Sequence, residues 1–174
     1  ARRASVLRGD VIDRDTGAPI AGAVVSIDRH SEFGQTLTRA DGRFDLVING
    51  GGQLTLSVRK PGFLPAQRRL EVPWQSYVGV DTIALVTLDT QATVIDFSAP
   101  IQVASGSLTS DSDGTRQAVL MFPQSATATM VLQNDTVVPL PTLTVRATEI
   151  SVGPNGRAAM PGELPANSAY TYAA

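Results

Sequence analysis

The first half of the chain alternates apolar and polar positions over short runs. In residues 20–28 the odd-numbered positions from Ala21 to Ile27 are apolar, which is the period of two of a half-buried strand. Similar runs predict about seven strands, the number of an antiparallel sandwich: Val6–Ile12, Ile20–Asp28, Gln35–Arg39, Phe44–Ile48, Leu54–Arg59, Arg68–Val72 and Val78–Leu88. Asp41-Gly42 between two of these runs indicates a hairpin, because glycine accepts the positive φ of the turn.

The second half repeats this pattern less regularly after a composition shift near residues 89–92. Strand-like runs are expected at Thr93–Phe97, Ile101–Ala104, Gln117–Phe122, Ala128–Gln133 and Thr142–Ile150, with loops at Ser105–Thr115, Pro139–Pro141 and Val152–Tyr172. We therefore expect an all-β chain with a sandwich domain at 1–89. A second, incomplete β-sandwich or plug-like unit is expected at 90–174, and our hypothesis is that its missing strands follow Ala174.

Composition limits the chemistry that the chain can perform. The 174 residues hold 14 Lys+Arg, 16 Asp+Glu, one His and no Cys, for a formal charge of -2. This charge supplies no basic field for nucleic acid or an anionic membrane, and no apolar run reaches the length of a membrane span. Thiolate chemistry and multi-His metal sites are excluded. We therefore expect no enzyme, with no catalytic, metal-binding or cofactor-binding residues.

The histidine and several acidic residues are candidates for a catalytic or metal-binding site. His30 could act as a general base oriented by Glu32 or Asp28, but no placed nucleophile accompanies it, which favours a loop histidine. The carboxylates at 10, 13 and 15 diverge along a strand, which favours a turn cap over a metal cluster. Asp111 and Asp113 begin a calcium-like pattern without its closing glutamate, and whether they bind calcium stays open.

Trp74 and Tyr77 are the candidate anchors of the chain. Exposed aromatic side chains serve as stacking platforms in sugar-binding modules, so these two residues are the best carbohydrate candidates. The alternative is a packing anchor between the two β units, which we prefer for Trp74 because it follows Pro73. The basic pairs Arg2-Arg3, Arg59-Lys60 and Arg68-Arg69 are interpreted as parts of a solvated sheet face.

Several motifs resemble known families. The stretch from Gly9 to Asp28 and the run Thr38–Phe44 resemble the carboxypeptidase regulatory-like family, which is a seven-strand transthyretin-like (prealbumin-like) sandwich. Phe44–Val47, Asn49-Gly50-Gly51, Leu54–Leu56, Pro65, Arg68-Arg69, Pro73-Trp74 and Val80–Thr82 look like the transthyretin-related domain of teneurins and bacterial YD-repeat (Rhs-like) proteins. Residues 94–172 are similar to the start of the fibronectin-plug that follows this domain and seals a β-shell in that family.

The resemblance implies a function. The chain is expected to be a non-catalytic scaffold segment of a large secreted or surface protein, with the YD-repeat shell of its own polypeptide as partner. A bacterial source is expected because the basic residues are almost all Arg, with Lys60 as the only Lys. Two alternatives stay open: an extracellular adhesion or carbohydrate-binding module, and an accessory domain of a metallopeptidase.

Overall fold

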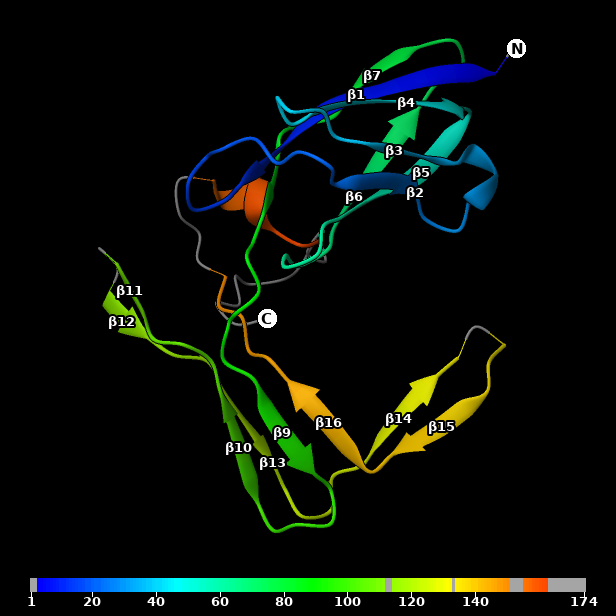
Figure 1. Ribbon diagram of the computed structural model, residues 1–174. Helices are drawn as coiled ribbons and strands as arrows, with labels where there is room; N and C mark the ends of the chain where they lie inside the picture. The colour runs from blue at the N-terminus through cyan, green and yellow to red at the C-terminus, as the bar shows by residue number, and fades with distance from the viewer. Residues whose placement is uncertain (1–2, 112–113, 133, 151–154, 163–174) are drawn as a thin grey trace. The chain divides into compact units, whose positions relative to one another are not determined.

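The chain forms two compact units built from strands. In the computed structural model (Figure 1) residues 3–111, 114–132, 134–150 and 155–162 are described. The first unit comprises Ala1–Thr87 and Ile150–Tyr170, and the second comprises Leu88–Glu149 with Thr171–Ala174. The described regular structure is β-strand apart from two short 3-10 turns, η1 (Ser31–Phe33) and η2 (Gly156–Ala159).

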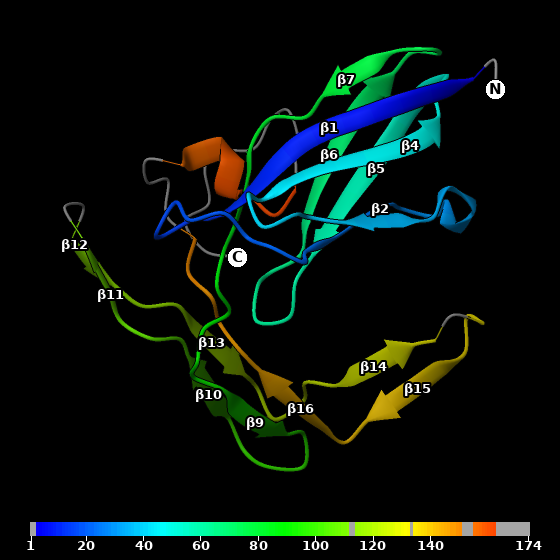
Figure 2. The same ribbon diagram turned by 45° about the horizontal axis from the view of Figure 1, so that its top comes forward.

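Two sheets face each other in the first unit (Figure 2). Their strands are β1 (Ala4–Asp13), β2 (Val24–Ile27), β3 (Gln35–Leu37), β4 (Arg43–Asn49), β5 (Gly52–Arg59), β6 (Ala66–Val72), β7 (Tyr77–Gly79) and β8 (Ile83–Leu85). In one sheet β1 lies between β4, which is antiparallel to it, and β7 and β8, which are parallel to it. The other sheet has the order β3-β2-β5-β6. The predicted all-β sandwich is confirmed.

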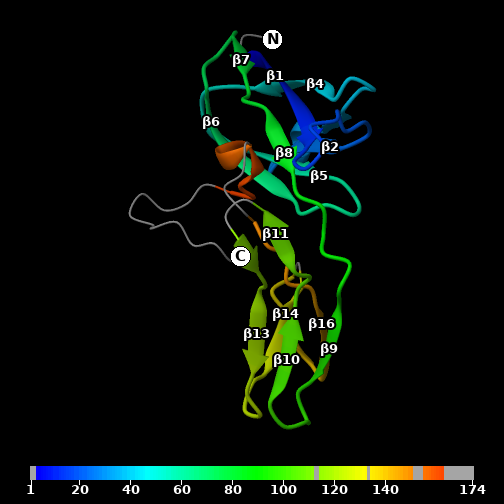
Figure 3. The same cartoon turned by 90° about the vertical axis from the view of Figure 1, so that its left-hand side faces the viewer.

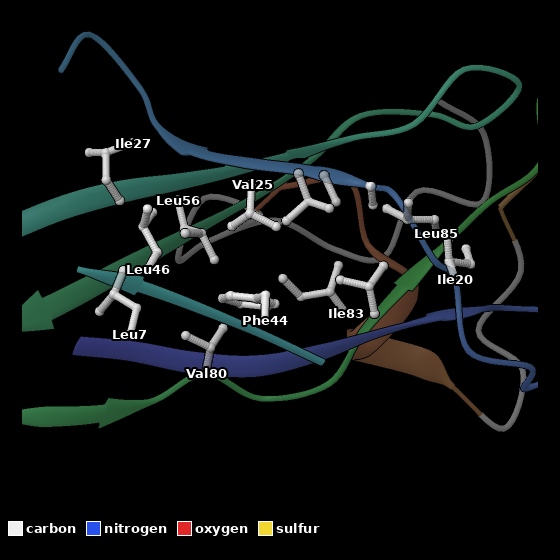
Figure 4. Packing of buried hydrophobic residues seen from close by; sticks show 14 of the residues in the cluster. Leu7, Ile20, Val25, Ile27, Phe44, Leu46, Leu56, Val80, Ile83 and Leu85 are labelled. Carbon is white, nitrogen blue, oxygen red and sulfur yellow. The ribbon is translucent and has the colours of Figure 1, made fainter. Parts of the chain in front are cut away.

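The apolar positions of the two sheets meet in one core (Figure 4). Alternate residues of β4 point inward, and the ring of Phe44 on this strand is fully buried. Ala23, Val25 and Ile27 of the predicted apolar face are buried as well, whereas Ala21 is exposed and only Val24–Ile27 is strand. Gly42, in the turn before β4, has a φ of 78° and a Cβ there would meet the carbonyl oxygen of Val11. The Asp-Gly turn is therefore required by both dihedral angle and space.

The predicted strand Val78–Leu88 is in fact two strands. β7 pairs with Val6–Arg8 and β8 pairs with Val11–Asp13. Between them the buried Val80 donates its N–H to the Arg8 carbonyl, and the Thr82 hydroxyl donates to the Asp10 carboxylate. These contacts break the alternation of one continuous strand, which periodicity alone did not indicate.

Residues 155–162, which we call the return segment, pack on the first unit. The Arg68 guanidinium donates to the carbonyls of Ala158 and Met160 at 2.7 and 2.8 Å. The Gln67 N–H donates to the Pro161 carbonyl at 2.6 Å. Ala159 is buried with Ala84 and Val86 of the first unit. The structure thus assigns the return segment to the first unit, whereas the predicted domain bounds of 1–89 and 90–174 placed it in the second.

The second unit is a set of strand pairs. Its strands are β9 (Thr93–Asp96), β10 (Gln102–Ser105), β11 (Thr109–Asp111), β12 (Gly114–Arg116), β13 (Val119–Phe122), β14 (Ala128–Val131), β15 (Val137–Leu140) and β16 (Thr142–Val145). The pairs β10–β13, β11–β12, β14–β15 and β9–β16 are antiparallel. In Figure 3 β10 and β13 lie side by side.

Polar contacts hold the ends of the second unit. The Asp89 carboxylate accepts bonds from the Ser107 hydroxyl and from the N–H groups of Ser107 and Gln91. Arg146 donates to the carbonyls of Asp89 and Thr90, and Arg116 pairs with the buried Glu149 at 2.7 Å. Burial raises the pKa of Asp89, but its hydrogen bonds outweigh that effect and leave it below the ordinary value.

The sequence analysis missed three strands of the second unit, β11, β12 and β15. β11–β12 lies in the predicted loop 105–115, since its Thr, Ser and Gly residues carry no apolar period. β15 contains Pro139, which is tolerated because among the described strands β15 pairs with β14 alone and has a free edge.

Phe44→Ala should lower the free energy of unfolding by about 3–5 kcal/mol, because it empties the centre of the core. Urea unfolding of the 174-residue chain measures this loss. Val47→Ala on the same strand is the matched control, since Val47 is 61% exposed and its loss should cost about 0.5 kcal/mol or less. Equal losses in the two variants would contradict the assigned core.

Arg68→Ala should release the return segment, because it removes both guanidinium bonds to that segment. Amide hydrogen exchange in peptides covering residues 155–162 should become faster, and a loss of about 1–2 kcal/mol is expected where those carbonyls stay buried. The control is Arg69→Ala at the exposed neighbouring position. Unchanged exchange in Arg68→Ala would show that the segment is held by other contacts.

Candidate functional site

Trp74 lies in a turn of fixed shape between β6 and β7. The buried Ser5 hydroxyl donates to the Pro73 carbonyl at 2.5 Å and accepts the N–H of Ser76. The indole nitrogen lies against Gly51, where any Cβ would collide with it, and Gly51 has a φ of 114°. The glycine run 50–52, which the sequence indicated only as a break, thus supports the Pro-Trp turn.

Trp74 is not a core residue. Its side chain is 55% exposed, and the Arg3 guanidinium lies 5.2 Å from its ring centroid. The turn adjoins Ser5 near the start of β1, whereas Thr87, the last residue of the first unit before the second, follows β8, which pairs with Val11–Asp13 at the other end. Eight residues of strand separate these ends by about 26 Å. The anchor role of Trp74 between the two units stays a prediction.

A groove of about 370 Å³ opens beside this turn. It is lined by residues from the start of the chain, the η1 loop and the β4–β5 turn: Arg3, His30, Glu32, Phe33, Asn49, Gly50, Gly51, Gly52, Gln53 and Leu54. The backbone of the turn is fixed by bonds from the Gly50 N–H to the Arg3 carbonyl and from the Gly51 N–H to the Val72 carbonyl. The groove therefore has a rigid floor.

His30 forms one wall of the groove. Its ring stacks on Phe33 at 4.9 Å, and its Nδ1 lies 2.8 Å from the Glu32 carboxylate. This hydrogen bond lowers the pKa of Glu32. The expected His30–Glu32 pairing is present, while Asp28 is placed near Arg29 instead. Among the described side chains, no hydroxyl group is hydrogen-bonded to His30, so we interpret the His30–Glu32 pair as part of the groove wall.

Tyr77 lies outside the groove, on the outer face of the β4-β1-β7 sheet. In the strand register Val47, Val6 and Tyr77 form one row across this face. Tyr77 is 76% exposed, and the Arg8 guanidinium lies 5.8 Å from its ring centroid. The two predicted anchors therefore have different surroundings.

A charged cluster flanks this row. Asp45 accepts from Arg8 Nε at 2.5 Å and from Arg39 Nη1 at 2.8 Å. These two hydrogen bonds hold the pKa of the Asp45 carboxyl below its ordinary value, and burial opposes them weakly. Asp45 of β4 thus pairs with Arg8 of β1 and with Arg39 of the loop between β3 and β4.

The remaining candidates have structural surroundings. Asp13 caps its turn by accepting from the N–H groups of Asp15 and Thr16, as predicted. Arg68 was expected on a solvated face, and this was wrong because it is half-buried and holds the return segment. The side chains of Asp111 and Asp113, the candidate calcium ligands, lie outside the described residues.

The described residues contain neither a cluster of metal-ligating side chains nor a membrane-spanning helix. Within that part of the chain no three His, Asp or Glu side chains gather as metal ligands. Among the helices that the structure describes, none has the length and apolar character needed to cross a bilayer.

Known proteins identify the first unit. The family model described as the teneurin TTR-like domain matches residues 1–85. Residues 1–85 are a transthyretin-like domain of the teneurin type. Teneurin-3 of Mus musculus is 33% identical over 140 residues, which covers 78% of this chain and 5% of the relative. Teneurin-1 of Homo sapiens is 41% identical over 85 residues, covering 49% of this chain and 3% of the relative.

These relatives are far longer than the chain, and they come from animals. The chain spans about 5% or less of the length of these teneurins, and they are animal proteins, which give the expected bacterial source no support. Among solved structures, 5-hydroxyisourate hydrolase of Klebsiella pneumoniae is similar with a TM-score of 0.35 and 25% identity, over 46% of this chain and 90% of that one.

Lowering the pH should remove the contribution of Asp45 to stability. A carboxyl whose pKa is lowered in the folded state stabilises the fold above its unfolded pKa of about 3.9, and this contribution disappears as the pH falls through the folded pKa. Asp45→Asn should therefore be less stable than the parent chain at pH 7, with the difference shrinking toward pH 2. Chemical denaturation across this range measures it, and a constant difference would contradict the pairing.

Proposed function

We propose that this chain is a non-catalytic structural segment of a large YD-repeat protein related to teneurins. In this proposal the teneurin-type domain is followed by a plug-like unit that packs against a β-shell formed by the rest of the same polypeptide and seals it. The observation that carries the proposal is the apolar surface of the second unit. This surface requires a partner that the chain itself does not supply among its described residues.

The β10–β13 pair presents an apolar outer face. Val103 lies directly opposite Met121 in the register, and both side chains are exposed, Met121 by 72%. Ile101 and Val119 share this face by the alternation of the strands and are exposed as well. A contiguous apolar patch of this kind is typical of a surface that another chain segment covers.

The β14–β15 pair is apolar on both faces. Met130 is opposite Val138, and the next pair, Val131 opposite Val137, points to the other side. All four side chains are exposed. An isolated two-stranded hairpin is marginally stable in water, so this one is suited to insertion between apolar surfaces.

The two units differ in how they are held together. Of the described residues, both clusters of buried apolar side chains belong to the first unit. The second unit buries Ile95 and Ala104 but exposes most of its large apolar side chains. The first unit thus has a hydrophobic core of its own. The second unit exposes apolar surface of the kind that a partner covers in an interface.

The length of the relatives supports the rest of the polypeptide as the partner. The similarity to mouse teneurin-3 covers 140 residues and so extends past the transthyretin-like domain, while it uses 5% of that relative. A cell-surface or secreted location is proposed from the same kinship. The bacterial source rests on the arginine bias alone and stays a prediction, as does the absence of catalysis.

Met121→Glu should have little effect in the 174-residue chain and a large effect in the full polypeptide. In the 174-residue chain the position is exposed, and the free energy of unfolding should change by about 0.5 kcal/mol or less. In the full polypeptide the same carboxylate would be buried in the proposed interface at a cost of about 2 kcal/mol or more. Secreted yield and resistance of the second unit to proteolysis should both fall.

The matched control is Gln124→Glu, which adds the same side chain at an exposed turn position between β13 and β14. Hydrogen exchange supplies an independent measurement: amides of β10 and β13 should be more protected in the full polypeptide than in the 174-residue chain. Equal protection in both, together with a harmless Met121→Glu, would refute the packing role.

A further inference from the structure

The proposed structural role leaves the groove beside Trp74 without a purpose. The groove belongs wholly to the first unit, and its volume of about 370 Å³ lies in the range of small-molecule sites. Its lining combines a fixed glycine floor with a wall of polar side chains. Packing of the domain alone does not require polar side chains in the lining of this groove.

The polar lining can both donate and accept hydrogen bonds. Asn49 and Gln53 contribute amides, Glu32 a carboxylate and Arg3 a guanidinium. A groove lined by both a carboxylate and amides suits the hydroxyls of a sugar, since each hydroxyl donates one bond and accepts others. The hydrogen bond between Glu32 and His30 lowers the pKa of Glu32, which favours its hydrogen-bond-accepting carboxylate form.

An aromatic ring stands at the rim of this polar groove. The ring of Trp74 contacts Gly51 of the groove floor, and Arg3, which lines the groove, lies over the ring. Ser5 fixes the turn that carries the ring, so the exposed indole surface needs little ordering before it receives a ligand. An exposed, fixed indole beside amide and carboxylate groups is a stacking platform for the apolar face of a sugar.

We propose that the groove lined by Arg3, Glu32, Asn49 and Gln53, with Trp74 at its rim, binds a saccharide. A sugar ring stacks on the exposed part of Trp74, and the hydroxyls of the adjoining unit bond to the polar side chains. A peptide strand fits less well, because β4 and β5 flank the groove through a tight turn and the lining has no row of exposed large apolar side chains. Nucleic acid fits less well because the lining contains the acidic Glu32 as well as the basic Arg3.

The test is binding of the folded 174-residue chain to a printed array of neutral and uronate-containing oligosaccharides. The parent chain should bind at least one class of oligosaccharide on the array. Trp74→Ala and Gln53→Ala should each weaken that binding by about tenfold or more. Trp74→Phe should recover part of it, since a smaller ring still stacks. Thermal unfolding shows whether each variant is folded before it is scored.

Tyr77→Ala is the matched control. It removes an exposed aromatic side chain that also lies under an arginine but does not line the groove. Its binding should stay within about twofold of the parent chain, and amides of residues 50–52 should shift on addition of the bound oligosaccharide in an NMR titration.

Two results would overturn the proposal: no array sugar bound by the folded parent chain, or binding that Trp74→Ala and Gln53→Ala leave unchanged. Neither result bears on the structural role, because that role is tested at Met121 in the second unit.

Discussion

The parallel pairing of β7 and β8 with β1 is the constraint on which the first unit depends. β1 lies between β4 and these two short strands, so one ten-residue strand joins the turn at Ser5 to the point where β8 ends. Parallel neighbours cannot be joined by a hairpin, and the intervening chain forms β4 and the whole second sheet. The core around Phe44 and the position of Trp74 both follow from this topology.

Strand existence in the first unit was predictable because one face of each sheet is buried. Alternation then marks the strands directly, as in residues 24–27 and 44–48. In the second unit the predicted runs overlap β9, β10, β13, β14 and β16, but the signal misses the polar pair β11–β12 and the strand β15, which contains Pro139. Periodicity reports burial on one side, so it is weakest where strands lack a core.

The site was less predictable than the fold because its parts are distant in the sequence. Trp74 could be singled out because it is the only tryptophan in the sequence. Its contacts with Arg3 and Gly51 could not be predicted, because no sequence motif links these residues to Trp74. Arg68 shows the same limit: its two carbonyl partners lie 90 and 92 residues away, and a basic pair on an edge strand looks like a solvated face. Contacts of this kind are set by topology, which composition does not report.

The two units differ in how much of their apolar surface is buried within the unit itself. The first holds a closed core and fixes its turns with buried polar groups such as Ser5. The second fixes its ends through Asp89 and Glu149 while leaving apolar strand faces open. Because a domain that spent its apolar surface on its own core would have none left for a partner, the small interior of the second unit is a condition of the proposed packing role rather than a defect of the fold.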